Sequence, residues 1–178
     1  MNLWIVVRYG GNLRWARVIF AVLLPGIMTT MTKVEWSDHF CIGDDRVDQE
    51  HQDIFELVNE LQSAIDRQES MDKLAMMLEQ LAEHTIAHFQ HEESLMQDHA
   101  YPGLDRHKHC HDRLIQKVTK LMQQFQAGET GAIQNLMNFL ADWLRHHIKG
   151  EDQKMIQFMQ QKHHQLTMVG KAGELIGI

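Results

Sequence analysis

The chain has 178 residues, a formal net charge of −7 and a pI near 6.0. This length fits one domain with extensions, and 44% hydrophobic with 23% charged residues is typical of a globular protein. The acidic balance argues against nucleic acid or an anionic membrane surface as a partner, because both require a basic face. Only two prolines interrupt the chain, which favours long helices. The two cysteines, Cys41 and Cys110, are too few for a disulfide framework and indicate a reducing, cytoplasmic setting.

Residues 1–32 differ in composition from the rest of the chain. Three arginines precede the apolar run "VIFAVLLPGIM", which is shorter than the ~20 residues that span a bilayer and is interrupted by Pro25. No small-residue cleavage signal follows it. Three interpretations stay open: a start codon assigned too early, with translation from Met28 or Met31, an export signal, or a membrane-associated segment. We favour the early start and expect no stable membrane insertion.

Residues 33–160 contain four helical patterns separated by turn signals. The first is one apolar stripe with alternating steps of four and three residues: Val47, His51, Ile54, Val58, Leu61 and Ile65. Ser70 is the expected N-cap of the second pattern, which ends near Met96 before the turn "DHAYPG".

The third and fourth patterns have the same spacing. The third consists of Leu104, His107, His111, Leu114, Val118, Leu121 and Phe125. After "QAGETG" the fourth consists of Ile133, Leu136, Leu140, Trp143 and His147, and it continues to about Phe158. Four helices of about 20 residues with short loops predict an all-α fold, an antiparallel up-and-down four-helix bundle. Residues 161–178 have little periodicity, and we expect a C-terminal extension that frays.

Histidine is over-represented, with thirteen residues where roughly four or five are expected. A single histidine on an apolar stripe is most often a core residue with a local hydrogen bond. Here five of them lie on or beside the inward faces of the four helices: His51, His88, His107, His111 and His147. A shared ligand explains all five more economically than five independent causes.

The segment "AHFQHEESLM" can be sorted by the rotation of about 100° per helical residue. His88 borders the apolar face of its helix and Glu92 lies at the centre of that face. His84 and His91 fall on the flank, where a solvated or supporting role is expected. Glu93 lies about 100° from the centre of the apolar face and is expected to carry surface charge.

A buried Glu92 requires a partner, because an unpaired buried carboxylate costs several kcal/mol. No lysine or arginine lies on the inward stripes, so the cation must come from outside the chain. His107 and His111, four residues apart, form a chelating pair, as do His88 and Glu92, whereas His109 points the other way. Imidazole and carboxylate ligands without thiolate suit iron, manganese or zinc.

These residues resemble the bacterial hemerythrin family. The matching segments are "DQEHQDIF" with His51, "HFQHEE" with His88 and Glu92, "HKHCH" with His107 and His111, and "WLRHHIKGED" with His147 and Asp152. They cover about residues 34–159 in order along the four helices, and seven positions with fixed local spacing rarely arise by chance.

The resemblance implies a non-haem di-iron centre with two iron ions per chain. It implies that His107, His111 and His147 hold one iron, that His51 and His88 hold the other, and that Glu92 and Asp152 bridge them beside an oxo or hydroxo group. Two octahedral irons offer about twelve positions, of which this set fills about eleven, so one stays open for dioxygen. Trp143, Leu144 and Ile148 would flank the dioxygen pocket, although packing within the bundle explains them equally.

One residue of this set conflicts with helical periodicity. Asp152 lies about 140° around an ideal helix from His147, whereas Glu151 lies at about 40° and nearer the apolar centre. We follow the resemblance and expect Asp152 to be the bridge, through a local distortion of the helix or a long reach.

The implied function is reversible dioxygen binding for storage, delivery or sensing, without enzymatic turnover. The alternatives are a di-iron oxidase or peroxidase-type enzyme, and a redox or oxygen sensor that acts through an unidentified protein partner. No histidine has a glutamate three residues before it, which argues against the ferritin-like di-iron enzymes. The His-Glu-x-x-His motif of zinc hydrolases is also absent.

Overall fold

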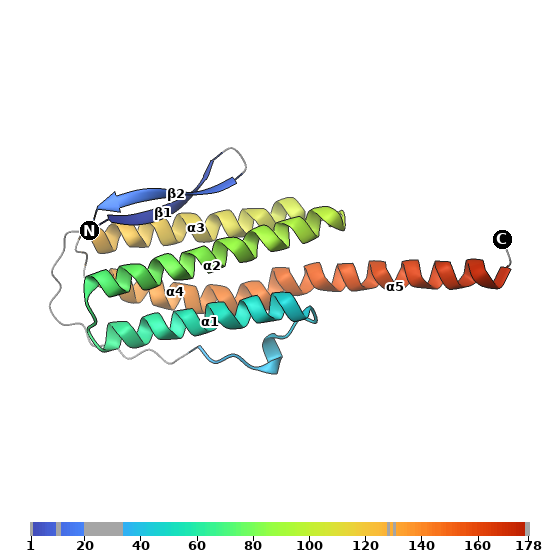
Figure 1. Cartoon of the computed structure of the whole chain (residues 1–178), viewed down its shortest axis with the longest axis horizontal. Helices are drawn as coiled ribbons and strands as arrows, with labels where there is room; N and C mark the ends of the chain where they lie inside the picture. Colours follow the sequence, from blue (N-terminus) through green and yellow to red (C-terminus); the bar gives the residue numbers. More distant parts are fainter. Residues whose placement is uncertain (1, 10–11, 20–33, 128, 130, 177–178) are drawn as a thin grey trace.

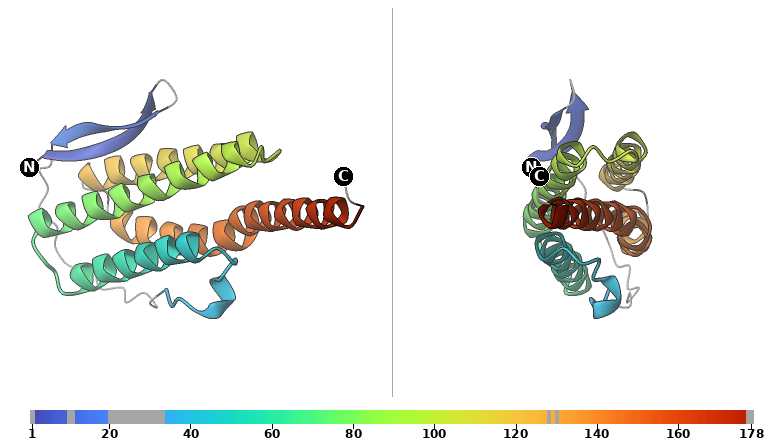
Figure 2. Two further views of the ribbon diagram at one scale, coloured as in Figure 1. Left: turned by 45° about the vertical axis from the view of Figure 1, so that its right-hand side comes forward. Right: turned by 90° about the vertical axis from the view of Figure 1, so that its right-hand side faces the viewer.

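Four long helical segments form an antiparallel up-and-down bundle in the computed structural model of the chain (Figure 1), which describes residues 2–9, 12–19, 34–127, 129 and 131–176. The segments are α1 (Asp45–Asp66), α2 (Met71–Asp98), α3 (Leu104–Gln126), and a rod made of α4 (Ala132–His147), the π-helical turn η2 (Ile148–Asp152) and α5 (Gln153–Ile176). The end-on view in Figure 2 shows the helices surrounding one shared interior. The predicted bundle is confirmed.

Local signals in the sequence explain where the helices begin. The side chain of Asp44 accepts hydrogen bonds from the backbone N–H groups of Arg46 and Val47 at the start of α1. The predicted N-cap Ser70 is confirmed, because its hydroxyl accepts the Lys73 N–H at the start of α2. Before α4, Gly131 has φ +83°, a left-handed conformation that glycine adopts at little cost. The starts of these helices therefore follow from signals close in sequence.

The apolar stripes meet in a continuous core. Its fully buried members include Phe55 and Leu61 on α1, Met96 on α2 and Leu136 on α4. The segment before α1, which includes the short helix η1 (Asp38–Phe40), is held by buried Asp48, which accepts hydrogen bonds from the backbone N–H groups of Ile42 and Gly43. A polar cluster interrupts this core near the turn η2.

The two predicted extensions contain regular structure. Strands β1 (Asn2–Tyr9) and β2 (Asn12–Ile19) pair antiparallel, from Asn2 opposite Ile19 to Tyr9 opposite Asn12, and β1 lies against α2 and α3. Periodicity did not predict this hairpin. The proposed starts Met28 and Met31 and the interrupting Pro25 lie outside the described residues.

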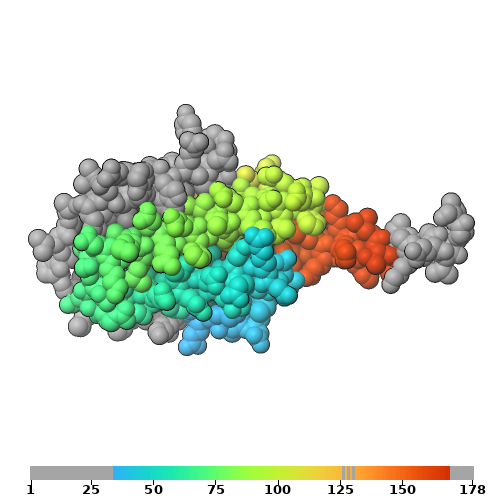
Figure 3. All heavy atoms as spheres, viewed as in Figure 1, coloured from blue at the N-terminus to red at the C-terminus, as the bar shows by residue number. Residues whose placement is uncertain are grey.

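The C-terminal segment continues α5 as a helix to Ile176. Figure 3 shows α5 projecting from the body of the bundle, and its side chains Leu166 and Met168 are exposed. Within the described ranges, no helix is both long enough and apolar enough to cross a bilayer.

Candidate metal centre

All seven side chains singled out in the sequence meet in one buried cluster. They come from every helical segment of the bundle, and each residue is at most 5% exposed. Together they are His51 from α1, His88 and Glu92 from α2, His107 and His111 from α3, His147 at the end of α4, and Asp152 at the end of η2. Residues more than 100 positions apart therefore share one site.

The cluster divides into two groups that share Glu92. One group consists of Glu92 with His107, His111 and His147, and the other of Glu92 with His51, His88 and Asp152. The ligand atoms within each group lie within 4.8 Å of one another. This division matches the two ligand sets that the family resemblance implies.

Both carboxylates lie between the two groups. Asp152 Oδ1 is 3.0 Å from His147 Nε2 and 3.1 Å from His107 Nε2, while Asp152 Oδ2 is 3.2 Å from His51 Nε2. Glu92 Oε2 is 3.2 Å from His111 Nε2 and 3.3 Å from His107 Nε2 in one group, and 3.7 Å from His88 Nε2 in the other. Each carboxylate can therefore face two ions at once.

The cluster fits a pair of metal ions because its polar atoms are otherwise unsatisfied. Both ring nitrogens of His51 and His107, and both carboxylate oxygens of Glu92 and Asp152, are buried without a hydrogen-bond partner. Each such atom costs about 1–3 kcal/mol when it stays unpaired. Ligands at right angles on one ion, at bond lengths of roughly 2.1 Å, lie roughly 3 Å apart. That is the spacing found here.

The turn η2 accounts for the position of Asp152. The N–H of Gln153 donates to the carbonyl of Ile148, five residues earlier, so one residue is inserted relative to an α-helix. Five residues then complete about one turn, which brings Asp152 onto the same face as His147. Glu151 instead lies at the rim and pairs with Arg106 at 2.9 Å and Lys154 at 3.0 Å.

A further carboxylate supports His88. Glu50 Oε2 accepts hydrogen bonds from Nδ1 of His88 at 3.1 Å and from Nδ1 of His91 at 2.9 Å, and Arg46 binds its other oxygen. Burial raises the pKa of Glu50, but the two histidines outweigh burial and hold this pKa at about 2. Glu50 is therefore an anion that fixes the ring orientation of His88. Sequence reasoning missed it, because its role depends on a contact between α1 and α2.

The expectation for Glu93 was wrong. Its side chain is buried, not at the surface, and it lies between Lys108 Nζ at 2.6 Å and His111 Nδ1 at 3.3 Å. Helical rotation places Glu93 only relative to the apolar centre of α2, whereas its charged partner, Lys108, comes from α3. His84 and His109 are exposed, in line with their predicted positions off the cluster.

The electrostatics of the cluster follow from its two central carboxylates. Burial lowers the pKa of His107, but the carboxylates of Asp152 and Glu92, 3.1 and 3.3 Å from its Nε2, raise it to about 10. Burial also lowers the pKa of His147, and there the neighbouring Asp152 does not reverse the shift. Without a metal cation, protons therefore bind some of the imidazoles in its place.

Aromatic rings cover two of the histidines. Phe89 stacks on His111 with ring centroids 3.7 Å apart, and Trp143 stacks on His147 at 4.1 Å. Beside them is a cavity of about 20 Å³, enough for one water-sized or diatomic molecule. Apart from His51, His88, His147 and Asp152, its walls are apolar or aromatic with one threonine. Trp143, Leu144 and Ile148, which the resemblance placed at this pocket, all line it.

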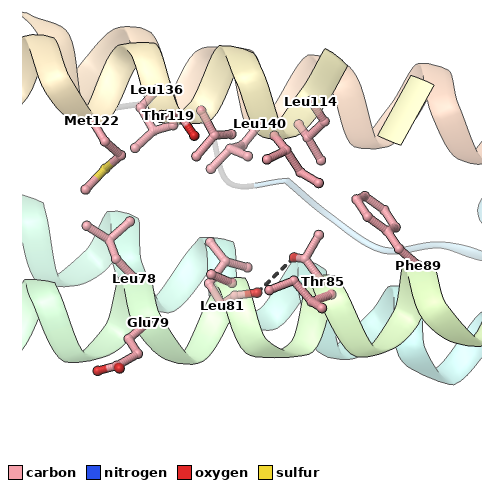
Figure 4. Close-up of a pocket in the computed structure, with 14 residues that line it drawn as sticks. Leu78, Glu79, Leu81, Thr85, Phe89, Leu114, Thr119, Met122, Leu136 and Leu140 are labelled. Atoms are coloured by element: carbon pink, nitrogen blue, oxygen red, sulfur yellow. Dashed lines mark hydrogen bonds between the residues drawn. The ribbon is translucent and has the colours of Figure 1, made fainter. Parts of the chain in front are cut away.

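A larger apolar cavity of about 100 Å³ adjoins the small one between α2, α3 and α4 (Figure 4). The two cavities share the lining residues Leu81, Thr85, Phe89, Leu114 and Leu140. The Thr85 hydroxyl donates to the carbonyl of Leu81 in its own helix, as the dashed line in Figure 4 shows. Its hydrogen-bonding capacity as a donor is therefore used locally.

Comparison with known proteins gives a consistent match over the bundle. Residues 42–159 match the hemerythrin HHE cation binding domain. Over 125 residues the chain is 37% identical to a bacteriohemerythrin of Stenotrophomonas maltophilia, which covers 69% of this chain and 79% of that protein. It is 34% identical to a bacteriohemerythrin of Pseudomonas aeruginosa (68% and 78% covered) and 30% identical to one of Methylococcus capsulatus (70% and 92% covered).

Proposed function

The chain belongs to the hemerythrin HHE cation-binding family, and on that premise we propose that it is a non-haem di-iron protein that reversibly binds dioxygen for storage, delivery or sensing. The observation that carries this proposal is the buried cluster of unsatisfied imidazole and carboxylate groups in two adjoining sets. The atoms of His51, His107, Glu92 and Asp152 lie 3.1–3.3 Å apart without aligned hydrogen bonds between them, as ligands of a shared ion do.

We propose His107, His111 and His147 as ligands of one iron and His51 and His88 as ligands of the other, with Glu92 and Asp152 bridging. When bound, two ferrous ions supply the electrons and the open coordination position that dioxygen requires. The chain supplies the rest. Glu50 orients His88, Glu93 orients His111, and Phe89 and Trp143 hold their stacked imidazoles in place.

The cavities favour binding over turnover. Dioxygen is small and apolar, so the larger cavity offers it a dry route toward the cluster. Cleavage of the O–O bond is promoted by a positioned acid. Within the described part of the chain, no acid other than the proposed ligands lines the small cavity, and the Thr85 hydroxyl donates to the carbonyl of Leu81. We therefore propose a dioxygen-binding protein, not an oxidase or peroxidase-type enzyme.

Sensing would require output through another protein. Storage and delivery would require only the bundle. The free cysteines Cys41 and Cys110 are compatible with the reducing cytoplasm predicted from composition, and that compartment stays a prediction.

The proposal is tested by metal analysis and optical spectra of the purified protein under nitrogen and then air. Two irons per chain and a charge-transfer band that forms in air and disappears on removal of dioxygen are expected. Zinc alone, or irreversible oxidation with turnover of a substrate, would contradict the proposal.

A further inference from the structure

A groove on the protein surface lies close to the metal cluster. The groove, of about 640 Å³, runs between α3 and α4, and its lining includes three exposed cations: Arg113, Lys117 and Lys120. They are spaced by four and three residues, so they share one face of α3. Among the residues that the structure describes, no aspartate or glutamate lines the groove. In a chain with a net charge of −7, this is a local reversal of sign.

Trp143 separates this groove from the metal cluster. Its side chain lines both the groove and the small cavity beside the cluster. The indole is partly exposed, and it stacks on the imidazole of His147 with ring centroids 4.1 Å apart and planes inclined by 20°. Two aromatic systems in contact therefore connect the groove to a proposed iron ligand.

We propose that the groove and Trp143 form the docking site through which an electron-transfer protein with an acidic surface reduces the oxidised iron pair. This inference rests on the proposed function, because a carrier whose irons have been oxidised to the ferric state no longer binds dioxygen. Each docking event transfers one electron from the reduced cofactor of the partner to one ferric ion. Two events return both irons to the ferrous state, and each partner leaves oxidised by one electron.

The arrangement of charge favours a protein partner over a small anion. From Arg113 to Lys120 the cations extend about 10 Å along α3, and none is buried as it would be around a single phosphate. Asp142, which precedes Trp143, pairs with Arg145 at 3.7 Å, so its negative charge is partly balanced. Complementary charge accelerates encounter by about 10- to 1,000-fold at low ionic strength. An acidic partner therefore docks with its cofactor near Trp143.

The test measures how fast the diferric protein is reduced in a stopped-flow instrument at low ionic strength. The donors are a reduced acidic [2Fe–2S] ferredoxin and, as a small cationic reductant, the methyl viologen radical. The double variant Lys117→Glu with Lys120→Glu is compared with Arg67→Glu with Lys73→Glu at the turn between α1 and α2. Both pairs change the net charge by the same amount, and Arg67 and Lys73 are exposed.

We expect the groove variant to be reduced by ferredoxin at least tenfold more slowly than the control variant. The advantage of the wild type should shrink toward 0.5 M salt, where screening is strong. Reduction by the viologen radical should not slow. Equal ferredoxin rates in the two variants would overturn the proposal, and so would an equal slowing with viologen, since that indicates damage at the irons.

Trp143 is tested separately from docking. Trp143→Leu keeps an apolar side chain at the groove, so it should weaken the Kd for ferredoxin, measured by calorimetry, less than Lys117→Glu with Lys120→Glu does. It should slow electron transfer within the complex at least tenfold while reduction by the viologen radical does not slow. Trp143→Phe, which keeps an aromatic ring, should restore part of the rate. Unchanged electron transfer in Trp143→Leu would refute the route through the indole.

Two further outcomes are distinguishable. If reduction by flavin mononucleotide hydroquinone depends on Lys117 and Lys120 and reduction by ferredoxin does not, the groove binds a small anionic reductant and the proposal is wrong. Failure of the proposed function would appear independently, as absence of two irons or of a reversible dioxygen spectrum. The Kd for ferredoxin, measured by calorimetry, tests docking separately from iron content and from the dioxygen spectrum.

Discussion

Asp152 lies inside the cluster and its neighbour Glu151 lies at the rim, and amide replacements separate their roles. Asp152→Asn removes one charge from a side chain whose two oxygens lie 3.0–3.2 Å from three imidazole nitrogens. Glu151→Gln removes the same charge from a side chain at the rim that pairs with exposed Arg106. The variants match in chemistry and differ only in position.

The expected magnitude follows from metal linkage. Loss of a hydrogen bond behind a metal ligand costs about 10- to 100-fold in metal affinity, so loss of a charged bridging ligand should cost at least about 100-fold. A ligand present at about 1,000 times its Kd stabilises the fold by about 4.1 kcal/mol, and at about ten times by about 1.4 kcal/mol. The difference of about 2.7 kcal/mol corresponds to about 10 °C in Tm for a bundle of this size. Glu151→Gln should change stability by at most about 1 kcal/mol, as is typical of exposed ion pairs.

The assay is anaerobic titration of the metal-free proteins with Fe(II), followed by thermal unfolding and iron analysis. The Tm of each metal-free variant serves as its own baseline. Asp152→Asn should lose most of the iron-dependent increase in Tm, whereas Glu151→Gln should keep two irons per chain. If Glu151→Gln lost the iron and Asp152→Asn kept it, the argument from the π-helical turn would be refuted.

Three further predictions concern the surroundings of the cluster. Glu50→Gln should weaken iron binding by about 10- to 100-fold, because an amide holds the His88 ring less firmly than a carboxylate does. Competition with a chelator measures the iron affinity. An unchanged affinity would contradict the role assigned to Glu50. In the metal-free protein the pKa of His107 is about 10, so folding favours its protonated form. That contribution to stability is fully present below about pH 6.5, the usual histidine value, and is lost as pH rises toward 10. The Tm of the metal-free protein should show this loss between pH 6.5 and 10. The loss should be smaller in a His107→Gln variant, in which His88 still has a raised pKa, and absent from the iron-loaded protein. Leu140 lines both cavities, so Leu140→Phe should narrow the passage between them and slow dioxygen association several-fold. Flash photolysis measures the association rate, and iron content should stay constant. An unchanged rate would show that dioxygen reaches the cluster by another route.

Local sequence patterns were sufficient for the helices and for most of the cluster. Steps of three and four residues identified all four helical segments, and Ser70 identified the start of α2. The same steps placed His51, His107, His111 and His147 on inward faces, because a histidine at a stripe position faces the core wherever the helix packs. The absence of lysine or arginine from these stripes predicted an external cation before any contact was visible.

Other features depend on contacts between segments that are distant in sequence. Glu50 on α1 supports His88 on α2, and Glu93 on α2 supports His111 on α3. The rotation of a single helix contains no information about such contacts, and for Glu93 it led to the wrong face. The hairpin of β1 and β2 was likewise not expected from composition, which had suggested only an apolar, basic extension.

Sequence alone therefore determined that this protein is a helical bundle with a metal-binding interior, because periodicity and residue type act within one helix. Only the tertiary structure decided how Asp152 reaches the cluster. Ideal helical rotation favours Glu151, and the inserted residue of η2 turns the chain by the missing angle. The tertiary structure also decided that Trp143 lies between the cluster and a basic groove, since that placement arises only where α3 packs against α4.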